Sequence, residues 1–242
     1  MKITLALILV FIASAVFAQE YKMITKEIKD SSEAGKYWYS AKYPQVDGMP
    51  NKQIQSAINE SIFKTVDKCL GDFRKDMSEW EVPYELTEVN SFMDINYESF
   101  VLNEDLFSFS FEVYTYYAGA AHPNSYTISH NWNMKNGKFL TFSGLFKKNS
   151  GYLEKISKFC IENLKLQAKM SDYEMIDDML QSGAGPNDSN FMNFNFFQKG
   201  MLITFDRYQV APYAAGTQYV LIPYIAFYEM LTEDCFLNKF NY

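Results

Sequence analysis

The stretch that decides the fold is SFMDINYESFVLNEDLFSFSFEVYTYY, residues 91–117. Apolar and polar residues alternate over residues 93–101 and again over residues 107–113. A period of two is typical of strands that bury one face. Between them, Asn103-Glu104-Asp105 has the composition of a turn. We therefore predict two half-buried strands joined as a hairpin, each with an apolar face.

The same alternation predicts more strands on both sides of this hairpin. A strand rich in aromatic residues is expected before it, and several short strands are expected after it. Asn136-Gly137 predicts a tight turn between two of the later strands. The predicted strands cover residues 36–43, 126–133, 139–140, 191–197, 201–205 and 218–222.

Apolar residues that recur every three or four positions predict helices at residues 52–77, behind an Asn51 N-cap, and at 150–167. A third helix is expected at 223–231, where Pro223 suits the first turn, and a loop at 182–190. Strands and helices are segregated rather than alternating along the chain. We therefore predict an α+β fold of antiparallel sheets with helices packed on one face, in two closely packed subdomains.

The N-terminus has the features of a secretory signal peptide. Lys2 precedes an apolar run to Val16, and Val16-Phe17-Ala18 resembles a cleavage site. The run is shorter than the roughly 20 residues that span a bilayer, although an uncleaved anchor is the alternative. We predict a signal peptide at 1–18, an N-terminal domain at 19–120, a C-terminal domain at 121–242 and a periplasmic or secreted protein. No later segment predicts a transmembrane helix.

Composition narrows the function classes. The net charge is −7 and there is no block of Lys or Arg, which argues against a nucleic-acid partner. The 21 Phe and 18 Tyr are expected to fill a core, with a carbohydrate-stacking surface as the alternative. Three cysteines, Cys69, Cys160 and Cys235, lack metal-ligand spacing. We prefer three buried thiols to one disulfide and one free thiol.

Two loops carry the candidate site residues. The first runs from Ala118 to Asn124, where small residues and Pro123 bend the chain around His122. His122 could act as a general base or contact a ligand, or its ring could tie the loop to nearby backbone. The other histidine, His130, shares a strand face with apolar residues, so we expect it in the core.

The second loop is Phe205-Asp-Arg-Tyr-Gln-Val-Ala-Pro-Tyr-Ala-Ala-Gly216. Tyr208 and Tyr213 are rigid amphipathic side chains of the kind used in recognition, or their hydroxyls stabilise the connection. We name as hypothetical binding residues Gly119, His122, Pro123, Asn124, Tyr208, Pro212, Tyr213 and Gly216.

No pattern identifies a catalytic residue, a metal site or a cofactor. The chain lacks the spacing of zinc ligands, a Gly-rich phosphate loop and a Gly-x-Ser-x-Gly elbow. A carboxylate pair for glycoside hydrolysis stays open, because such pairs form in space rather than in sequence.

The two loops resemble a known family. Gly119-Ala-Ala-His-Pro-Asn124, Asn136-Gly-Lys138 and Leu145-Phe146 are similar to the G-G-A-H-P-N, G-K and L-F pattern of the RsiV-like extracytoplasmic domain. Residues 205–224 resemble its C-terminal signature, and Tyr43-Pro44 with Ile58-Asn59 resembles its usual small N-terminal companion domain. Ala120 departs from the pattern by replacing its second glycine.

The resemblance implies an extracytoplasmic α+β module. Members include the outer domain of lysozyme-sensing anti-sigma factors and the non-catalytic part of a peptidoglycan deacetylase. This sequence has neither the sigma-binding segment nor the deacetylase domain, so those activities do not carry over. We expect a non-catalytic envelope protein that binds lysozyme or a cell-wall glycan. The alternatives are a cell-wall hydrolase that uses His122 and a structural envelope protein.

Overall fold

The computed structural model describes residues 21–32, 36–80, 89–171, 175–233, 235 and 237. The predicted signal peptide lies outside these residues. The strands are β1 (Lys22–Ser31), β2 (Tyr37–Asp47), β3 (Ser91–Leu102), β4 (Leu106–Tyr116), β5 (Asn124–Asn133), β6 (Lys138–Phe139), β7 (Phe194–Phe196), β8 (Gly200–Phe205) and β9 (Gln218–Pro223). The α-helices are α1 (Lys52–Glu79), α2 (Tyr152–Met170) and α3 (Asp177–Ala184). Short 3-10 turns occupy Ser143–Leu145, Asp188–Phe191, Tyr213–Ala215, Tyr224–Ala226 and Tyr228–Met230.

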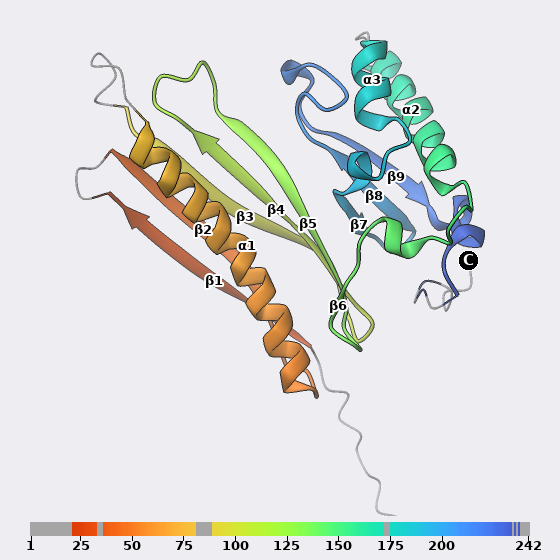
Figure 1. The fold of residues 1–242 in the computed structure, drawn as a ribbon, viewed down its shortest axis with the longest axis horizontal. Helices are drawn as coiled ribbons and strands as arrows, with labels where there is room; N and C mark the ends of the chain where they lie inside the picture. The colour runs from red at the N-terminus through yellow and green to blue at the C-terminus, as the bar shows by residue number, and fades with distance from the viewer. Residues whose placement is uncertain are drawn as a thin grey trace, which may run out of the picture.

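Strands β1 to β6 form one sheet in chain order, and β7 to β9 form a second, smaller sheet (Figure 1). The α+β fold is confirmed, and so is the β3–β4 hairpin, which pairs antiparallel from Phe92↔Tyr116 to Leu102↔Phe107. The expectation of purely antiparallel sheets is wrong at one place, because β2 and β3 are parallel. Helix α1 connects them, and parallel neighbours need a crossover of this kind.

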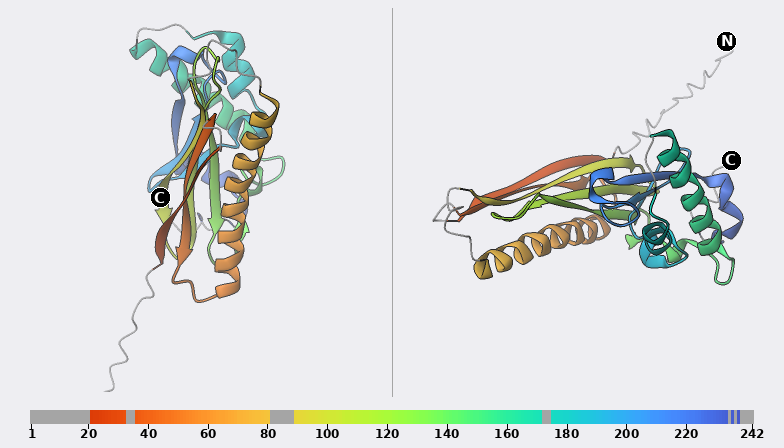
Figure 2. Two further views of the ribbon diagram at one scale, coloured as in Figure 1. Left: turned by 90° about the vertical axis from the view of Figure 1, so that its left-hand side faces the viewer. Right: turned by 90° about the horizontal axis from the view of Figure 1, so that it is seen from above.

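Helix α1 lies along one face of the large sheet (Figure 2). Asn51 caps the helix by accepting hydrogen bonds from the backbone N–H groups of Gln53 and Ile54, as predicted. Its buried stripe is Ile58, Ile62, Val66, Cys69, Leu70 and Phe73. This stripe forms one core with buried side chains of β2, β3 and β4, so that the apolar face of the helix meets the apolar face of the sheet.

The small sheet has its own core beneath α2 and α3, at one end of the molecule (Figure 1). Its inner side meets the large sheet on the face opposite to α1. The contact between the sheets is polar. Asn195, fully buried, donates from Nδ2 to the carbonyl of Phe109 at 2.9 Å, and its Oδ1 accepts from Ser129 at 3.0 Å. Ser108 donates to Asn131 at 2.7 Å. Every one of these buried side chains has a hydrogen-bond partner, which is what burial of polar groups requires.

The secondary structure differs from the predicted elements at three places. Strand β1 was not predicted, because nearly all its residues are exposed and half of them are charged, as suits an edge strand. The predicted loop at 182–190 contains the end of α3 and a 3-10 turn. The predicted helix at 223–231 is wrong. Phe227 has φ −142°, outside the helical region, and its burial in the core divides the segment into two 3-10 turns.

The structure also bears on the cysteines, the domain boundary and the membrane-spanning segments. Cys69, Cys160 and Cys235 are buried free thiols, as preferred. The proposed boundary at residues 120/121 lies between β4 and β5, which pair over ten residues, and the division into domains stays a prediction. None of the helices in the described part of the chain is long and apolar enough to cross a membrane.

Candidate functional site

The two loops singled out in the sequence meet in space. The ring of His122, from the β4–β5 loop, stacks on the ring of Tyr213, from the β8–β9 loop, with centroids 3.9 Å apart. The Tyr213 hydroxyl donates to the carbonyl of Pro123 at 2.8 Å. The hydroxyl oxygen of Tyr208 lies 3.4 Å from His122 Nε2. We call His122, Pro123, Arg207, Tyr208 and Tyr213 the loop cluster.

Arg207 joins the loop cluster although sequence reasoning had not selected it. Its guanidinium carbon lies 4.9 Å from the centroid of the Tyr213 ring, which is a cation–π distance. One of its terminal nitrogens donates to the Ser125 hydroxyl at 2.8 Å. The sequence signal that could have identified Arg207 is its position in a loop, between Asp206 and the aromatic Tyr208.

Backbone geometry holds the loop cluster in place. Tyr208 has φ 66°, a left-handed conformation that is rare and costly for a residue with a side chain. Asp206, two residues before Tyr208, anchors this turn, because its carboxylate accepts from the Thr127 N–H at 3.0 Å and from Asn193 at 3.2 Å. Burial raises the pKa of Asp206, and the hydrogen bonds from Thr127 oppose that rise. The conformation of Tyr208 therefore comes from its surroundings rather than from its own preference.

The remaining predicted residues shape the loops. Gly119 and Gly216 have positive φ values of 95° and 71°, which turn the two loops. Asn124 begins β5 and pairs with Thr115. Pro212 accepts the Ala215 N–H in the 3-10 turn that carries Tyr213. These four residues are therefore placed to support the loop cluster, whereas His122, Pro123, Tyr208 and Tyr213 form it.

His130 lies in the core, as expected. It is 4% exposed, its ring stacks on Phe109 at 5.0 Å, and its Nε2 is 3.2 Å from the Thr65 hydroxyl. Burial lowers its pKa to about 4. Within the described residues its Nδ1 has no hydrogen-bond partner, so only one of the two ring nitrogens is satisfied.

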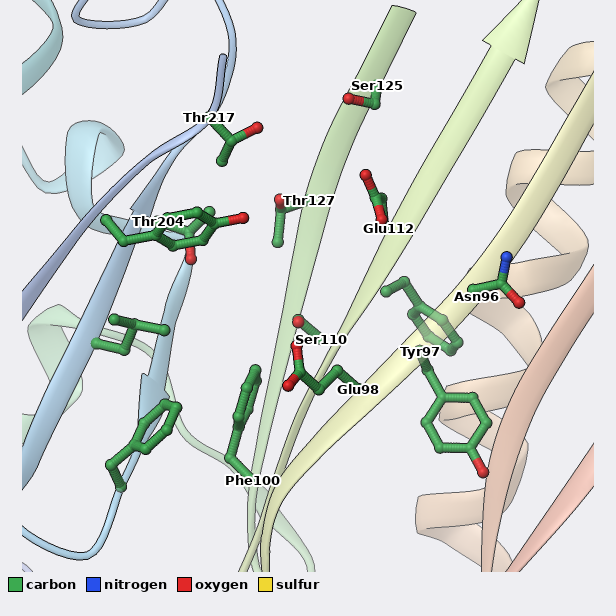
Figure 3. A pocket seen from close by; sticks show the side chains of 14 residues that line it. Asn96, Tyr97, Glu98, Phe100, Ser110, Glu112, Ser125, Thr127, Thr204 and Thr217 are labelled. Atoms are coloured by element: carbon green, nitrogen blue, oxygen red, sulfur yellow. The ribbon is translucent and has the colours of Figure 1, made fainter. Parts of the chain in front are cut away.

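A groove of about 280 Å³ opens beside the loop cluster, between the outer face of the large sheet and the strands β8 and β9 (Figure 3). Glu98 and Glu112 stand on neighbouring strands at its wall, and Thr127, Thr204 and Thr217 contribute hydroxyls. Sequence reasoning missed these residues, because each is one of many polar positions on alternating strands. Tyr97 also borders the groove, but its hydroxyl lies 2.6 Å from that of Thr25 on β1.

The chemistry of the loop cluster suits contact better than proton transfer. His122 is exposed, and its Nδ1 is 2.9 Å from the carbonyl of Pro123. Among the described residues, His122 contacts Pro123, Tyr208 and Tyr213 but no carboxylate, and in a catalytic triad a carboxylate orients the histidine that acts as general base. Across the same residues, no group of three or more His, Cys, Asp or Glu side chains is placed to hold a metal.

Two family models match different parts of the chain. Residues 28–125 match the model of the family named deacetylase PdaC, and residues 143–225 match that of a family described as a protein of unknown function (DUF3298). The first match includes the β4–β5 loop and the second includes the β8–β9 loop. The loop cluster is therefore formed where the two matched parts touch.

Two curated relatives, both from Bacillus subtilis (strain 168), match most of the chain. One is peptidoglycan-N-acetylmuramic acid deacetylase PdaC, 26% identical over 196 residues, which are 81% of this chain and 39% of PdaC. The other is anti-sigma-V factor RsiV, 28% identical over 201 residues, which are 82% of this chain and 65% of RsiV. The chain thus spans less than two thirds of the length of either relative.

Two crystal structures of DUF3298 family members share the fold. The protein from Bacteroides fragilis NCTC 9343 has a TM-score of 0.64 at 14% identity and aligns over 92% of this chain and 97% of its own. The protein from Pseudomonas aeruginosa PAO1 has a TM-score of 0.56 at 12% identity, over 90% and 96%. At such identities the likeness shows the fold alone.

Proposed function

We propose that this chain is a binding protein of the cell envelope, because its two halves match the PdaC and DUF3298 families and its curated relatives are PdaC and RsiV. Its loop cluster would contact a cationic protein partner, of which lysozyme is the first choice. The observation that carries the proposal is the union of the two motif loops into one exposed aromatic surface.

The geometry of the loop cluster supports a role in recognition. Tyr208 is 54% exposed although its backbone is held in a costly conformation. Strain that persists at an exposed aromatic side chain is typical of functional sites. Tyrosines held rigidly lose little conformational entropy on binding, and they are enriched among residues that dominate binding energy.

Charge supports a cationic partner. The net charge of −7 would attract a basic protein such as lysozyme and speed the encounter. We expect this long-range term to weaken with added salt, because the Debye length falls to about 8 Å at physiological ionic strength. The export that such a partner requires rests on the predicted signal peptide, so the periplasmic or secreted location is part of this proposal.

The test is calorimetry of residues 19–242, which include the whole described structure, with hen-type lysozyme at low and moderate salt. We expect saturable binding that weakens with salt. Tyr213→Ala should weaken it by about tenfold or more, the effect of losing a residue that contributes at least 1.4 kcal/mol. Tyr228→Ala is the control, because Tyr228 is an exposed tyrosine outside the loop cluster. Failure to bind at either salt concentration would exclude lysozyme.

A hydrolase that uses His122 is the competing hypothesis from another class. Purified protein would have to release soluble fragments from peptidoglycan, and His122→Ala would have to abolish that release while the circular dichroism spectrum stays unchanged. We expect no release from either protein, because the contacts of His122 provide no carboxylate to orient its ring.

A cell-wall glycan is the second candidate ligand, and the groove beside the loop cluster favours it. One relative is named for its action on peptidoglycan. A structural envelope protein without a ligand would be indicated if neither lysozyme nor glycan bound.

A further inference from the structure

The outer face of the large sheet, opposite to α1, is only partly covered by the small sheet (Figure 1). Along β3 this face carries alternate residues from Phe92 to Glu98. The six steps from Phe92 to Glu98, at about 3.3 Å each, extend for about 20 Å, which gives an extended ligand room for several units. The face ends at the groove, so the open surface and the groove are continuous.

Aromatic rings stand in a row at the open end of this face. Trp38 pairs with Phe92 across β2 and β3, and Phe92 pairs with Tyr116 across β3 and β4. The rings of Trp38 and Phe92 are stacked, with centroids 4.9 Å apart and an interplanar angle of 8°. Trp38 is 39% exposed. We call Trp38, Phe92, Tyr114 and Tyr116 the aromatic row; Phe92 touches both tyrosines within 6 Å.

The groove at the other end combines aromatic walls with hydroxyl groups. Phe100 and Phe197 lie against each other at 4.8 Å, and Tyr219 is 51% exposed. Four side-chain hydroxyls line the groove and make no hydrogen bond to the described residues: those of Ser110, Thr127, Thr204 and Thr217. Flat apolar rings and free hydroxyls together suit a ligand with C–H faces and many polar groups, which describes a sugar chain better than an apolar peptide.

The carboxylates at the groove indicate which charge a bound sugar would carry. Glu98 and Glu112 form no ion pair within the described part of the chain, and Asp94 accepts only from Asn96. The pKa of Tyr219 is raised by burial and then by the charges of Glu112, Asp206 and Glu98. Arg207 is engaged by Tyr213 and Ser125, and Lys42, which stands on the same face of β2, lies opposite the carboxylate-bearing Glu27 of β1. This field repels anionic ligands and attracts ammonium groups.

We propose that the groove and the aromatic row together bind an oligosaccharide of amino sugars with free amines. The rings would stack on the sugar faces, the hydroxyls would bond the sugar hydroxyls, and Glu98 and Glu112 would pair with the ammonium groups. This inference rests on the second candidate ligand of the proposed function, and it does not involve the loop cluster.

The test compares two probes by calorimetry near pH 6, the glucosamine tetrasaccharide and its fully N-acetylated counterpart. We expect the free amine form to bind at least tenfold more tightly, with salt reducing the difference. Glu98→Gln with Glu112→Gln should abolish the difference, whereas Glu104→Gln, an exposed control outside the groove, should preserve it. Trp38→Ala should weaken both probes by about tenfold, and Tyr228→Ala should weaken neither.

Several outcomes would overturn the inference. They are no binding of either tetrasaccharide, equal binding of both, or a preference that survives the double glutamine variant. Lysozyme titrations of the same variants separate this inference from the proposed function. Lysozyme binding that depends on Tyr213 while no tetrasaccharide binds would remove the glycan site and leave the protein contact intact.

Discussion

Strand β4 shows how the two faces of the large sheet differ. One set of alternate side chains is fully buried beneath α1, and the other passes from a buried serine to an exposed glutamate. The first set is Phe107, Phe109 and Phe111, and the second is Ser108, Ser110 and Glu112. The same ladder of backbone hydrogen bonds therefore supports a closed apolar core on one face and a polar surface on the other.

The difference follows from what covers each face. Helix α1 brings an apolar stripe, so non-directional burial holds that side together. The small sheet brings Asn195 to the other side, where directional hydrogen bonds fix its position. The groove lies at the edge of the small sheet, whose strands β8 and β9 form one of its walls. Beyond the small sheet this face is open, and the aromatic row lies there. Stability is thus concentrated on one face, and the proposed glycan binding on the other.

The largest effect should come from the apolar face. Phe109→Ala removes a fully buried ring and leaves a cavity, so we expect the free energy of unfolding to fall by about 3–5 kcal/mol. Ser110→Ala, the next residue on the opposite face, should change it by less than about 0.5 kcal/mol. Urea denaturation of both variants measures the contrast. Equal losses would mean that the two faces contribute alike.

The buried polar contact should come next. Asn195→Ala would leave the carbonyl of Phe109 and the hydroxyl of Ser129 without their partner, at a cost of about 2–3 kcal/mol. Ser108 also accepts from Asn195, at 3.2 Å. The double variant Ser108→Ala/Asn195→Ala should therefore lose less than the sum of the single losses. Strict additivity in denaturant unfolding would show that the residues do not act as a network.

The smallest of the three effects depends on pH. The pKa of His130 is lowered by burial to about 4, so the unfolded chain binds its proton more readily than the folded chain. Stability is therefore full above about pH 6.5 and falls as the pH drops towards 4. Between pH 7 and pH 5 we expect this residue to account for a loss of about 2 kcal/mol.

The measurement compares urea unfolding of the protein and of His130→Phe at pH 7 and pH 5. The variant lacks the titrating group, so it should lose about 2 kcal/mol less over that interval. An identical pH dependence in both proteins would show that His130 does not titrate between the folded and unfolded states.

Local sequence patterns were sufficient to predict the strands and helices that bury one face. The hairpin at 91–117 and helix α1 were predicted because each buries one face, and burial imposes a period on the sequence. Strand β1 gave no such signal, because it lies at an edge and buries little. The segment 223–231 gave a misleading one, because burial of Phe227 and Met230 outweighs helix propensity.

The candidate sites depended on the fold to different degrees. The His122 and Tyr213 loops stood out by composition, but only the packing of the small sheet on the large one brings their rings to 3.9 Å. The groove gave no signal at all. Glu98 and Glu112 look like any solvent-facing strand residues until another sheet forms the second wall.

By itself, the sequence determined the α+β class, the main hairpin and helices, the burial of the three cysteines and the two loops of interest. Each of these depends on neighbours within a few residues or on composition. The tertiary structure alone decided the parallel β2–β3 pairing, the polar contact between the sheets, the loop cluster and the groove. These features join residues as far as about 90 positions apart, and no local period records which distant surfaces will meet.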